Sequence, residues 1–188
     1  MKFEETIIKD CFLINPIVYH DSRGYFFESF SQKIFYKNTG IKTNFIQDNQ
    51  SLSQKGVIRG LHTQLDNFAQ SKLIRVLSGK IIDIVVDYRK DSESFGQKLS
   101  TILSSDNFRQ LYIPKGCLHG FAVLSQQAVI SYKCDNYYNK ASEAGVIFND
   151  KTLNINWQID SDEATISEKD KGLPTWSEFL EKLNMRKI

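Results

Sequence analysis

The sequence is short of the features that mark several specialised protein classes. It has three cysteines and three prolines in 188 residues, and a net charge of only +2. A charge this close to zero gives no reason to expect a nucleic acid or a membrane surface as partner. No run of about 18 apolar residues occurs, so no membrane-spanning helix is expected. Glu4 and Glu5 stand where a secretory signal peptide would be apolar, which favours a cytoplasmic protein.

The cysteines do not form a disulfide pattern. Cys11, Cys117 and Cys134 are widely spaced and odd in number, which is typical of reduced thiols in a cytoplasmic protein. Cys134 could be proposed as a nucleophile, but no base lies beside it in the sequence. A buried thiol is the preferred interpretation.

Short β-rich segments dominate what the chain does contain. The 41% of hydrophobic and 24% of charged residues are ordinary for a soluble globular protein. The length fits one domain, which we assign to residues 1–188. Turn residues recur about every 8–12 positions, which favours a sandwich or barrel. The predicted strands are Asn44–Leu52, Val57–Gln64, Lys72–Leu77, Ile81–Tyr88, Lys98–Leu103, Gln110–Ile113, Gly120–Leu124 and Ala128–Tyr138.

Helical patterns are confined to Ser31–Asn38 and Thr175–Asn184. In the second segment Thr175 and Glu178 form a capping box, followed by an apolar stripe. With about eight to ten strands in one domain, we expect an all-β jelly-roll barrel with short peripheral helices. The C-terminal helix, at about residues 175–184, should pack on the barrel.

Two histidine segments carry the first functional signal. The pattern Pro114-x-Gly116-x-x-His119 resembles the second half of the cupin signature, in which the turn aims the histidine into the barrel. Many cupins bind a metal through that histidine and an upstream His-x-His. Here the upstream segment reads His62-Thr63-Gln64, so the second imidazole is missing. Two imidazoles without a well-placed carboxylate are a poor divalent site, so we predict neither a catalytic metal nor another cofactor.

Without a metal, the two histidines are candidates for acid–base chemistry, because a neutral imidazole held by a carboxylate is a base suited to neutral pH. Asp83 and Asp170 are the acids that could hold them. Asp83 shares a strand face with Ile81 and Val85, where a buried carboxylate needs a partner. The alternative is an edge-strand residue facing water. Asp170 ends Ser167-Glu168-Lys169-Asp170, a pattern that is also typical of a helix cap.

Aromatic and basic residues complete the candidate set. Tyr132 and Tyr138 have the same parity on the predicted strand, so their side chains share one face. Two tyrosines on one strand face usually belong to a core or an interface. The alternative is functional: an inward phenol could donate a proton, and a second ring could stack on a base. Four cations could bind a pyrophosphate, namely Arg59, Lys72, Arg75 and Lys169. The alternative for each is a solvated surface charge. Arg59 and His62 have opposite strand parity. A bulge near Gly60 is required to bring both side chains inside.

Taken in order, ten segments make the chain resemble the dTDP-4-dehydrorhamnose 3,5-epimerase family from near its start to Asp170. They are Asp21-Ser22-Arg23-Gly24-Tyr25-Phe26-Phe27-Glu28, Gln47-Asp48-Asn49, Arg59-Gly60-Leu61-His62, Lys72-Leu73-Ile74-Arg75-Val76, Phe95-Gly96-Gln97, Ile113-Pro114-Lys115-Gly116, His119-Gly120-Phe121, Tyr132-Lys133-Cys134, Tyr137-Tyr138 and Ser167-Glu168-Lys169-Asp170. Each piece is weak alone. The ordered set is highly specific.

The resemblance implies a metal-free cupin homodimer whose N-terminal strands cross to the partner. It implies epimerisation at C3 and C5 of dTDP-4-dehydro-6-deoxy-D-glucose, giving dTDP-4-dehydro-L-rhamnose for surface polysaccharide such as lipopolysaccharide. By this resemblance His62 is the base oriented by Asp170, Tyr132 is the acid on the opposite face, and Lys72 stabilises the enolate. His119, paired with Asp83, contacts the sugar. The implied substrate-binding positions are Arg23, Glu28, Gln47, Asp48, Asn49, Arg59, Glu143, Lys169 and Tyr138, whose ring stacks on the thymine.

Two departures leave the outcome of catalysis open. Thr63 and Cys117 stand where the family commonly has aromatic residues, and both neighbour catalytic candidates. Relatives with the same catalytic set epimerise a single centre or act on other 4-keto sugars, so a C3 or C5 epimerase of another nucleotide-linked 4-keto-6-deoxy sugar is the alternative. A metal-dependent cupin oxygenase and a non-catalytic sugar-binding cupin are the more distant alternatives.

Overall fold

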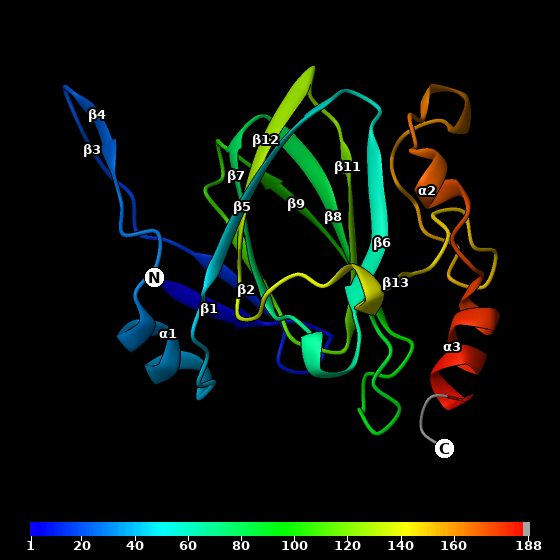
Figure 1. Cartoon of the computed structure of the whole chain (residues 1–188). Helices are drawn as coiled ribbons and strands as arrows, with labels where there is room; N and C mark the ends of the chain where they lie inside the picture. The colour runs from blue at the N-terminus through cyan, green and yellow to red at the C-terminus, as the bar shows by residue number, and fades with distance from the viewer. Residues whose placement is uncertain (186–188) are drawn as a thin grey trace.

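The computed structural model describes residues 1–185 and is built mainly of strands (Figure 1). The strands are β1 (Lys2–Glu5), β2 (Phe12–Asn15), β3 (Tyr19–Asp21), β4 (Gly24–Phe26), β5 (Gln47–Gln54), β6 (Ile58–Gln64), β7 (Lys72–Ser78), β8 (Lys80–Asp87), β9 (Lys98–Ser104), β10 (Gln110–Ile113), β11 (Cys117–Val123), β12 (Gln127–Cys134) and β13 (Glu143–Gly145). The α-helices are α1 (Gln32–Thr39), α2 (Glu168–Lys171) and α3 (Trp176–Met185), with 3₁₀ turns η1 (Asp66–Phe68), η2 (Lys140–Ser142) and η3 (Ser161–Glu163). None of the described helices is long and apolar enough to cross a membrane.

Two antiparallel sheets face each other. The first has the order β1-β2-β10-β7-β12-β5 and the second the order β13-β6-β11-β8-β9. All eight predicted strands are present, which confirms the mostly β prediction. The short strands β1 to β4 and β13 carried no recognisable alternation and were not predicted.

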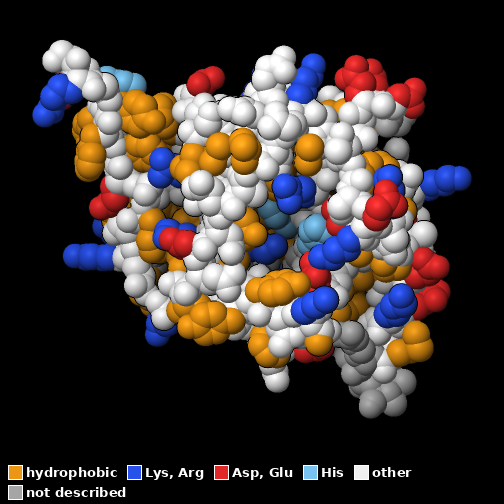
Figure 2. All heavy atoms as spheres, turned by 45° about the horizontal axis from the view of Figure 1, so that its top comes forward, with side chains coloured by type: hydrophobic (Ala, Val, Ile, Leu, Met, Phe, Trp, Pro, Cys, Tyr) orange, Lys and Arg blue, Asp and Glu red, His pale blue; other side chains and the backbone are white. Residues whose placement is uncertain are grey.

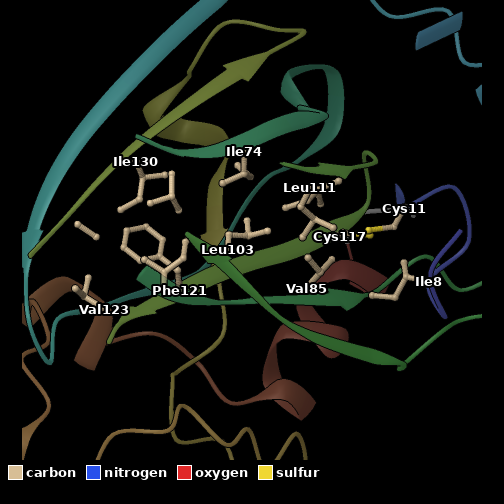
Figure 3. Close-up of a cluster of buried hydrophobic side chains, with 14 residues drawn as sticks. Ile8, Cys11, Ile74, Val85, Leu103, Leu111, Cys117, Phe121, Val123 and Ile130 are labelled. Carbon is tan, nitrogen blue, oxygen red and sulfur yellow. The ribbon is translucent and has the colours of Figure 1, made fainter. Parts of the chain in front are cut away.

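The core between the sheets takes side chains from both (Figure 3). On β8, Ile81 and Val85 point into this core, whereas Ile82 and Ile84 belong to a second cluster on the outer face. The predicted alternation of Ile81–Tyr88 is therefore confirmed. Burying each of these aliphatic side chains contributes about 1.5–3 kcal/mol. Because both faces of β8 and β11 are covered, nearly every residue of these two strands is buried.

Helix α3 covers the outer face of the five-stranded sheet and lies below α2 at the lower right of Figure 1. Its Trp176 and Phe179 are buried in the second cluster. The Thr175 N–H donates to Glu178 Oε2 at 2.8 Å, and the Glu178 N–H donates to Thr175 Oγ1 at 3.4 Å. The predicted helix and its capping box are confirmed, with bounds shifted by one residue.

The hairpin of β3 and β4 projects away from the two sheets at the upper left of Figure 1. Its aromatic side chains are widely exposed, with Tyr19 at 62% and Phe26 at 70%. In the described chain this hairpin pairs with neither large sheet.

One strand prediction ran too far. Strand β12 ends at Cys134, whereas the sequence predicted a strand up to Tyr138. Asp135 Oδ1 accepts the Ser71 N–H at 2.7 Å, and the chain leaves the sheet at this residue. The strand parity used for Tyr138 therefore does not apply.

Candidate active site

A cavity of about 540 Å³ opens between the two sheets. It is lined by Ser51, Val57, Ile58, Arg59, His62, Lys72, His119, Phe121, Ile130, Tyr132, Thr165, Ile166, Ser167, Lys169 and Asp170. A second hollow of about 270 Å³ shares His62, Lys72 and Tyr132 with it, and extends to Gln47, Asn49, Thr63, Gln64, Gln70, Tyr138 and Glu143. Figure 2 shows pale-blue histidine side chains at the floor of this central hollow, with Lys and Arg around its rim.

His62 and Asp170 form the first histidine–carboxylate pair. His62 Nε2 lies 2.8 Å from Asp170 Oδ1, and the Gly60 N–H donates to Asp170 Oδ2 at 3.1 Å. Burial alone would raise the pKa of Asp170, but the hydrogen bond and charge of His62, with the Gly60 and Ser167 contacts, hold that pKa below its ordinary value. Asp170 is therefore ionised at neutral pH and keeps the His62 ring in one orientation.

The two interpretations of Ser167-Glu168-Lys169-Asp170 are both partly right. Ser167 caps α2, because its Oγ accepts the Asp170 N–H at 3.1 Å. The Asp170 carboxylate does not close the box back onto Ser167. It leaves the helix and reaches His62 on β6 instead.

Gly60 explains how Arg59 and His62 both reach the cavity. The register between β6 and β11 shifts between His119 and Phe121, opposite Gly60. Gly60 has φ +119°, and a Cβ there would lie 2.6 Å from Gly120 Cα, so no other residue fits without movement. The predicted bulge is confirmed.

His119 and Asp83 form the second pair. His119 Nε2 lies 3.0 and 3.1 Å from the two Asp83 oxygens. Asp83 is 0% exposed on β8, between β9 and β11, so the edge-strand alternative is wrong. His119 is also the direct cross-strand neighbour of His62, which sets the two imidazoles side by side on one wall.

Lys72 and Tyr132 stand on the opposite wall, on β7 and β12 of the six-stranded sheet. Lys72 Nζ lies 6.0 Å from the centre of the Tyr132 ring. Within residues 1–185 this ammonium has neither a hydrogen bond nor an ion pair. Burial lowers the pKa of Lys72 and raises the pKa of Tyr132. The wall thus presents a desolvated amino group beside a phenol that holds its proton.

Arg59, Lys169 and Glu143 lie around the cavity mouth. The Arg59 guanidinium donates through Nε to Ser53 Oγ at 3.0 Å and forms no ion pair with a described carboxylate. Lys169 Nζ pairs with Glu143 Oε1, and the Tyr138 hydroxyl donates to Glu143 Oε2 at 3.0 Å. Burial would raise the pKa of Glu143, but these two contacts lower it.

Gln47 and Asn49 alternate inward on β5, and their side chains contact each other at 3.1 Å. Three other predicted substrate-binding residues are not brought to the cavity. Asp48 points to the outer face and pairs with Lys133 at 2.9 Å. Arg23 pairs with Asp21 on the projecting hairpin, and Glu28 is exposed just after it. Arg75 also lies elsewhere, with its guanidinium 4.8 Å from the centre of the Phe27 ring.

No three His, Cys, Asp or Glu side chains of the described residues come together as a metal-binding group. All three cysteines are buried and unpaired. Cys134 Sγ accepts from Asn49 Nδ2 at 3.7 Å, and burial raises the pKa of its thiol. The buried-thiol interpretation of Cys134 is confirmed.

Comparison with known proteins matches this chain to one family. The sequence profile of dTDP-4-dehydrorhamnose 3,5-epimerase matches residues 5–178. The dTDP-4-dehydrorhamnose 3,5-epimerase of Shigella flexneri is 46% identical over 170 residues, which cover 90% of this chain and 93% of that protein. The chain belongs to the dTDP-4-dehydrorhamnose 3,5-epimerase family.

Solved structures of the family superpose closely on the chain. The epimerase of Elizabethkingia anophelis is 48% identical with a TM-score of 0.92, covering 95% of this chain and 97% of that one. The dTDP-6-deoxy-D-glucose-3,5-epimerase of Legionella pneumophila, solved in complex with dTDP-4-keto-L-rhamnose, is 41% identical with a TM-score of 0.90. That match covers 98% of this chain and 95% of the other.

The two departures from the family pattern lie in different surroundings. The Thr63 hydroxyl contacts the Tyr88 hydroxyl at 3.1 Å and borders the smaller hollow. Cys117 is buried in the core between the sheets, where burial raises the pKa of its thiol. Thr63 is therefore the departure that borders the site.

Sequence reasoning missed several residues that line the cavity. Ser51 follows Gln47 and Asn49 at a spacing of two on β5, so alternation could have found it. Thr165 and Ile166 precede α2 and carry no such signal. They reach the cavity because the Thr165 backbone pairs with Gly56 and Ile58 beside β6.

Proposed function

We propose that the chain is a dTDP-4-dehydrorhamnose 3,5-epimerase, which inverts C3 and C5 of dTDP-4-dehydro-6-deoxy-D-glucose to give dTDP-4-dehydro-L-rhamnose. One observation supports this most strongly. A carboxylate-held histidine and a protonated tyrosine occupy opposite walls of one cavity, beside a desolvated lysine. Inversion of a carbon centre needs a base on one side and an acid on the other.

His62 acts as the base through Nδ1, because its Nε2 is held by Asp170. It removes the proton on the carbon next to the 4-keto group, and the electron pair of the C–H bond moves into the enolate. The ionised Asp170 stabilises the imidazolium that forms. His119, held by Asp83 on the same wall, contacts the sugar.

Tyr132 acts as the acid from the six-stranded sheet. Its raised pKa keeps the phenol protonated at neutral pH, so a proton is available for the opposite face of the sugar. After each inversion the imidazolium loses its proton to solvent and the phenolate regains one. Solvent hydrogen therefore enters the product at every inverted carbon.

Lys72 makes the abstraction possible. A proton beside a ketone is too weakly acidic for an imidazole unless the enolate is stabilised by several kcal/mol, and an ammonium in a dry site can supply about 3–4 kcal/mol. Lys72 forms no ion pair with any described residue, so its charge is free for the enolate oxygen.

The rim of the cavity holds the nucleotide. Arg59 and Lys169 are the cations for the pyrophosphate, and the Tyr138 ring stacks on the thymine. Glu143 holds both Lys169 and Tyr138 at this end. The Legionella pneumophila structure with dTDP-4-keto-L-rhamnose supports a dTDP-linked sugar as ligand.

We further propose a cytoplasmic homodimer of single cupin domains spanning residues 1–188, of which the last three lie outside the described residues. The exposed aromatic hairpin of β3 and β4 supports exchange of N-terminal strands with a partner. Exchange would carry Arg23 and Glu28, which do not reach the cavity of their own chain, to the partner's site. The product would feed surface polysaccharide synthesis.

Proton NMR of dTDP-4-dehydro-6-deoxyglucose in deuterated water, with purified protein and no added metal, tests the reaction. Deuterium at both C3 and C5 is the expected result. Deuterium at one carbon would replace the proposal with a single-centre epimerase. No exchange at either carbon would refute both. The same assay with and without a chelator tests the predicted absence of a catalytic metal.

A further inference from the structure

The segment after β12, residues 135–139, carries the exposed rings at the nucleotide end; we call it the tyrosine loop. Tyr137 is 62% and Tyr138 52% exposed. The tyrosine loop belongs to no sheet of the described chain. Exposed loops without strand pairing are ordinarily the mobile parts of a protein. A ring that must stack on a base needs a backbone held in place.

Three glutamine side chains hold this backbone. Gln70 Nε2 donates to Asn136 O at 2.7 Å. Gln47 Oε1 accepts the Tyr138 N–H at 3.2 Å, and Gln64 Oε1 accepts the Asn139 N–H at 2.9 Å. Gln47 begins β5, Gln64 ends β6 and Gln70 lies just before β7, so the tyrosine loop is tied to both sheets.

The chemistry of each contact is matched to the backbone group it meets. An amide side chain offers one acceptor oxygen and one donor nitrogen. Gln64 and Gln47 use the oxygen toward N–H groups, and Gln70 uses the nitrogen toward a carbonyl. Gln64 is only 5% exposed, and a buried amide is costly without partners. All three glutamines also border the smaller hollow, beside Tyr138.

We infer that Gln64 and Gln70 are positioning residues for nucleotide recognition. They fix the backbone on both sides of Tyr138, while Glu143 fixes its hydroxyl at 3.0 Å. The ring is then in place before the ligand arrives, so less conformational entropy is lost on binding. This inference rests on the proposed function, because it takes the base of a nucleotide sugar as the partner of the ring.

The test compares Gln64→Leu and Gln70→Leu with the wild-type chain, using calorimetry for the Kd of dTDP and steady-state kinetics. Each variant loses one hydrogen bond to the loop backbone. We expect this to raise both Kd and KM by about 2–12-fold, with kcat changed less than about twofold. Gln32→Leu is the matched control. Gln32 Nε2 also donates to a backbone carbonyl, Thr43 O at 3.1 Å, but it lies on α1 outside both hollows. It should leave Kd and KM unchanged.

A double-mutant cycle with Tyr138→Ala separates positioning from general stability. Gln64 is inferred to affect dTDP binding only through the position of the Tyr138 ring. Without the ring, Gln64→Leu should therefore change the Kd of dTDP by less than about twofold. An undiminished effect in the Tyr138→Ala background would overturn the inference, as would a fall in kcat at constant Kd. If Gln64→Leu fails to fold, the partly buried Gln70→Leu carries the same cycle. Wild-type protein that does not bind dTDP would overturn the proposed function as well, whereas tight wild-type binding with unchanged variants would overturn the positioning role alone.

Discussion

Asp170→Asn removes the negative charge from the cavity and changes the side-chain volume very little. The wild-type carboxylate accepts the Gly60 N–H with one oxygen and meets His62 Nε2 with the other. Asparagine has a single oxygen, and its NH₂ group can only donate. With the oxygen kept on Gly60, the NH₂ faces His62 Nε2, which must then accept. The ring proton moves to Nδ1, and the nitrogen that faces the substrate can no longer take up a proton.

The size of the effect follows from two losses. A hydrogen bond to a charged group is worth about 1.5–3 kcal/mol, which corresponds to about 10–150-fold in rate when it stabilises the imidazolium only during abstraction. The wrong tautomer adds to this, and in Ser-His-Asp hydrolases the same substitution costs about 10⁴-fold in kcat. We therefore expect kcat to fall by about 10²–10⁴-fold, with KM changed less than about threefold, because Asp170 contributes to the transition state rather than to ground-state binding.

The assay measures kcat and KM for epimerisation, deuterium exchange at each carbon, and thermal unfolding. Asp150→Asn is the matched control. Asp150 is 6% exposed, close to the 4% of Asp170, and its two oxygens accept the N–H groups of Leu153 and Trp176 at 2.7 and 2.9 Å. It should lower Tm without lowering kcat of the folded protein. An Asp170→Asn variant with kcat within about threefold of wild type would refute the role of Asp170 in orienting the base.

Four further predictions follow from the same geometry. In Tyr132→Phe, the rate of inversion should fall by about 10²–10⁴-fold while deuterium exchange with retention of configuration continues, because His62 can still remove and return a proton on its own face of the sugar. If NMR shows that exchange and inversion fall together, His62 and Tyr132 do not act as a separate base and acid. In Lys72→Met, kcat should fall by about 10²–10³-fold with a small change in KM, as stopped assays of product at saturating substrate can measure. On the alkaline side kcat should fall before pH 10.5, the ordinary pKa of lysine, because the pKa of Lys72 is lowered and its charge is lost as pH rises. The pKa of Tyr132 is raised, so its phenol stays protonated over the same range. If the alkaline fall in kcat persists in Lys72→Met, a group other than Lys72 causes it. Phe179→Ala should destabilise the fold by about 3–5 kcal/mol in denaturant unfolding, because α3 loses one of the two buried side chains that pack it on the five-stranded sheet. An unchanged unfolding midpoint would refute that role for the helix.

Period-2 alternation and turn residues determined most of the strands. Segments such as Ile81–Tyr88 bury one or both faces, so their hydrophobic pattern is strong enough to read without a structure. The strands β1 to β4 and β13 are only three or four residues long and show too few alternations to stand out. Strand β10 is equally short but was predicted, because Pro114 and Gly116 mark a turn directly after it. The end of β12 was misplaced because Ser71, far away in sequence, supplies the contact at Asp135.

The ordered motifs of the chain determined the family and the identity of His62, Lys72, Tyr132 and Asp170 as candidates. Residue types and spacings are local properties, so the sequence holds them in full. The pairings among these residues belong to the tertiary structure. Asp170 is separated from His62 by 108 positions, and only the packing of α2 against β6 brings its carboxylate to the imidazole.

Tertiary structure also decided which side chains share the cavity. Strand parity placed Arg59 and His62 on opposite faces until the register shift opposite Gly60 brought both inward. The tertiary structure leaves the Asp48 side chain outside the cavity, paired with Lys133, although the neighbouring side chains of Gln47 and Asn49 point into it. The sequence by itself determined which chemical groups are available. The fold decided which of them meet, because the distances that make a proton transfer or an ion pair possible are set by strands far apart along the chain.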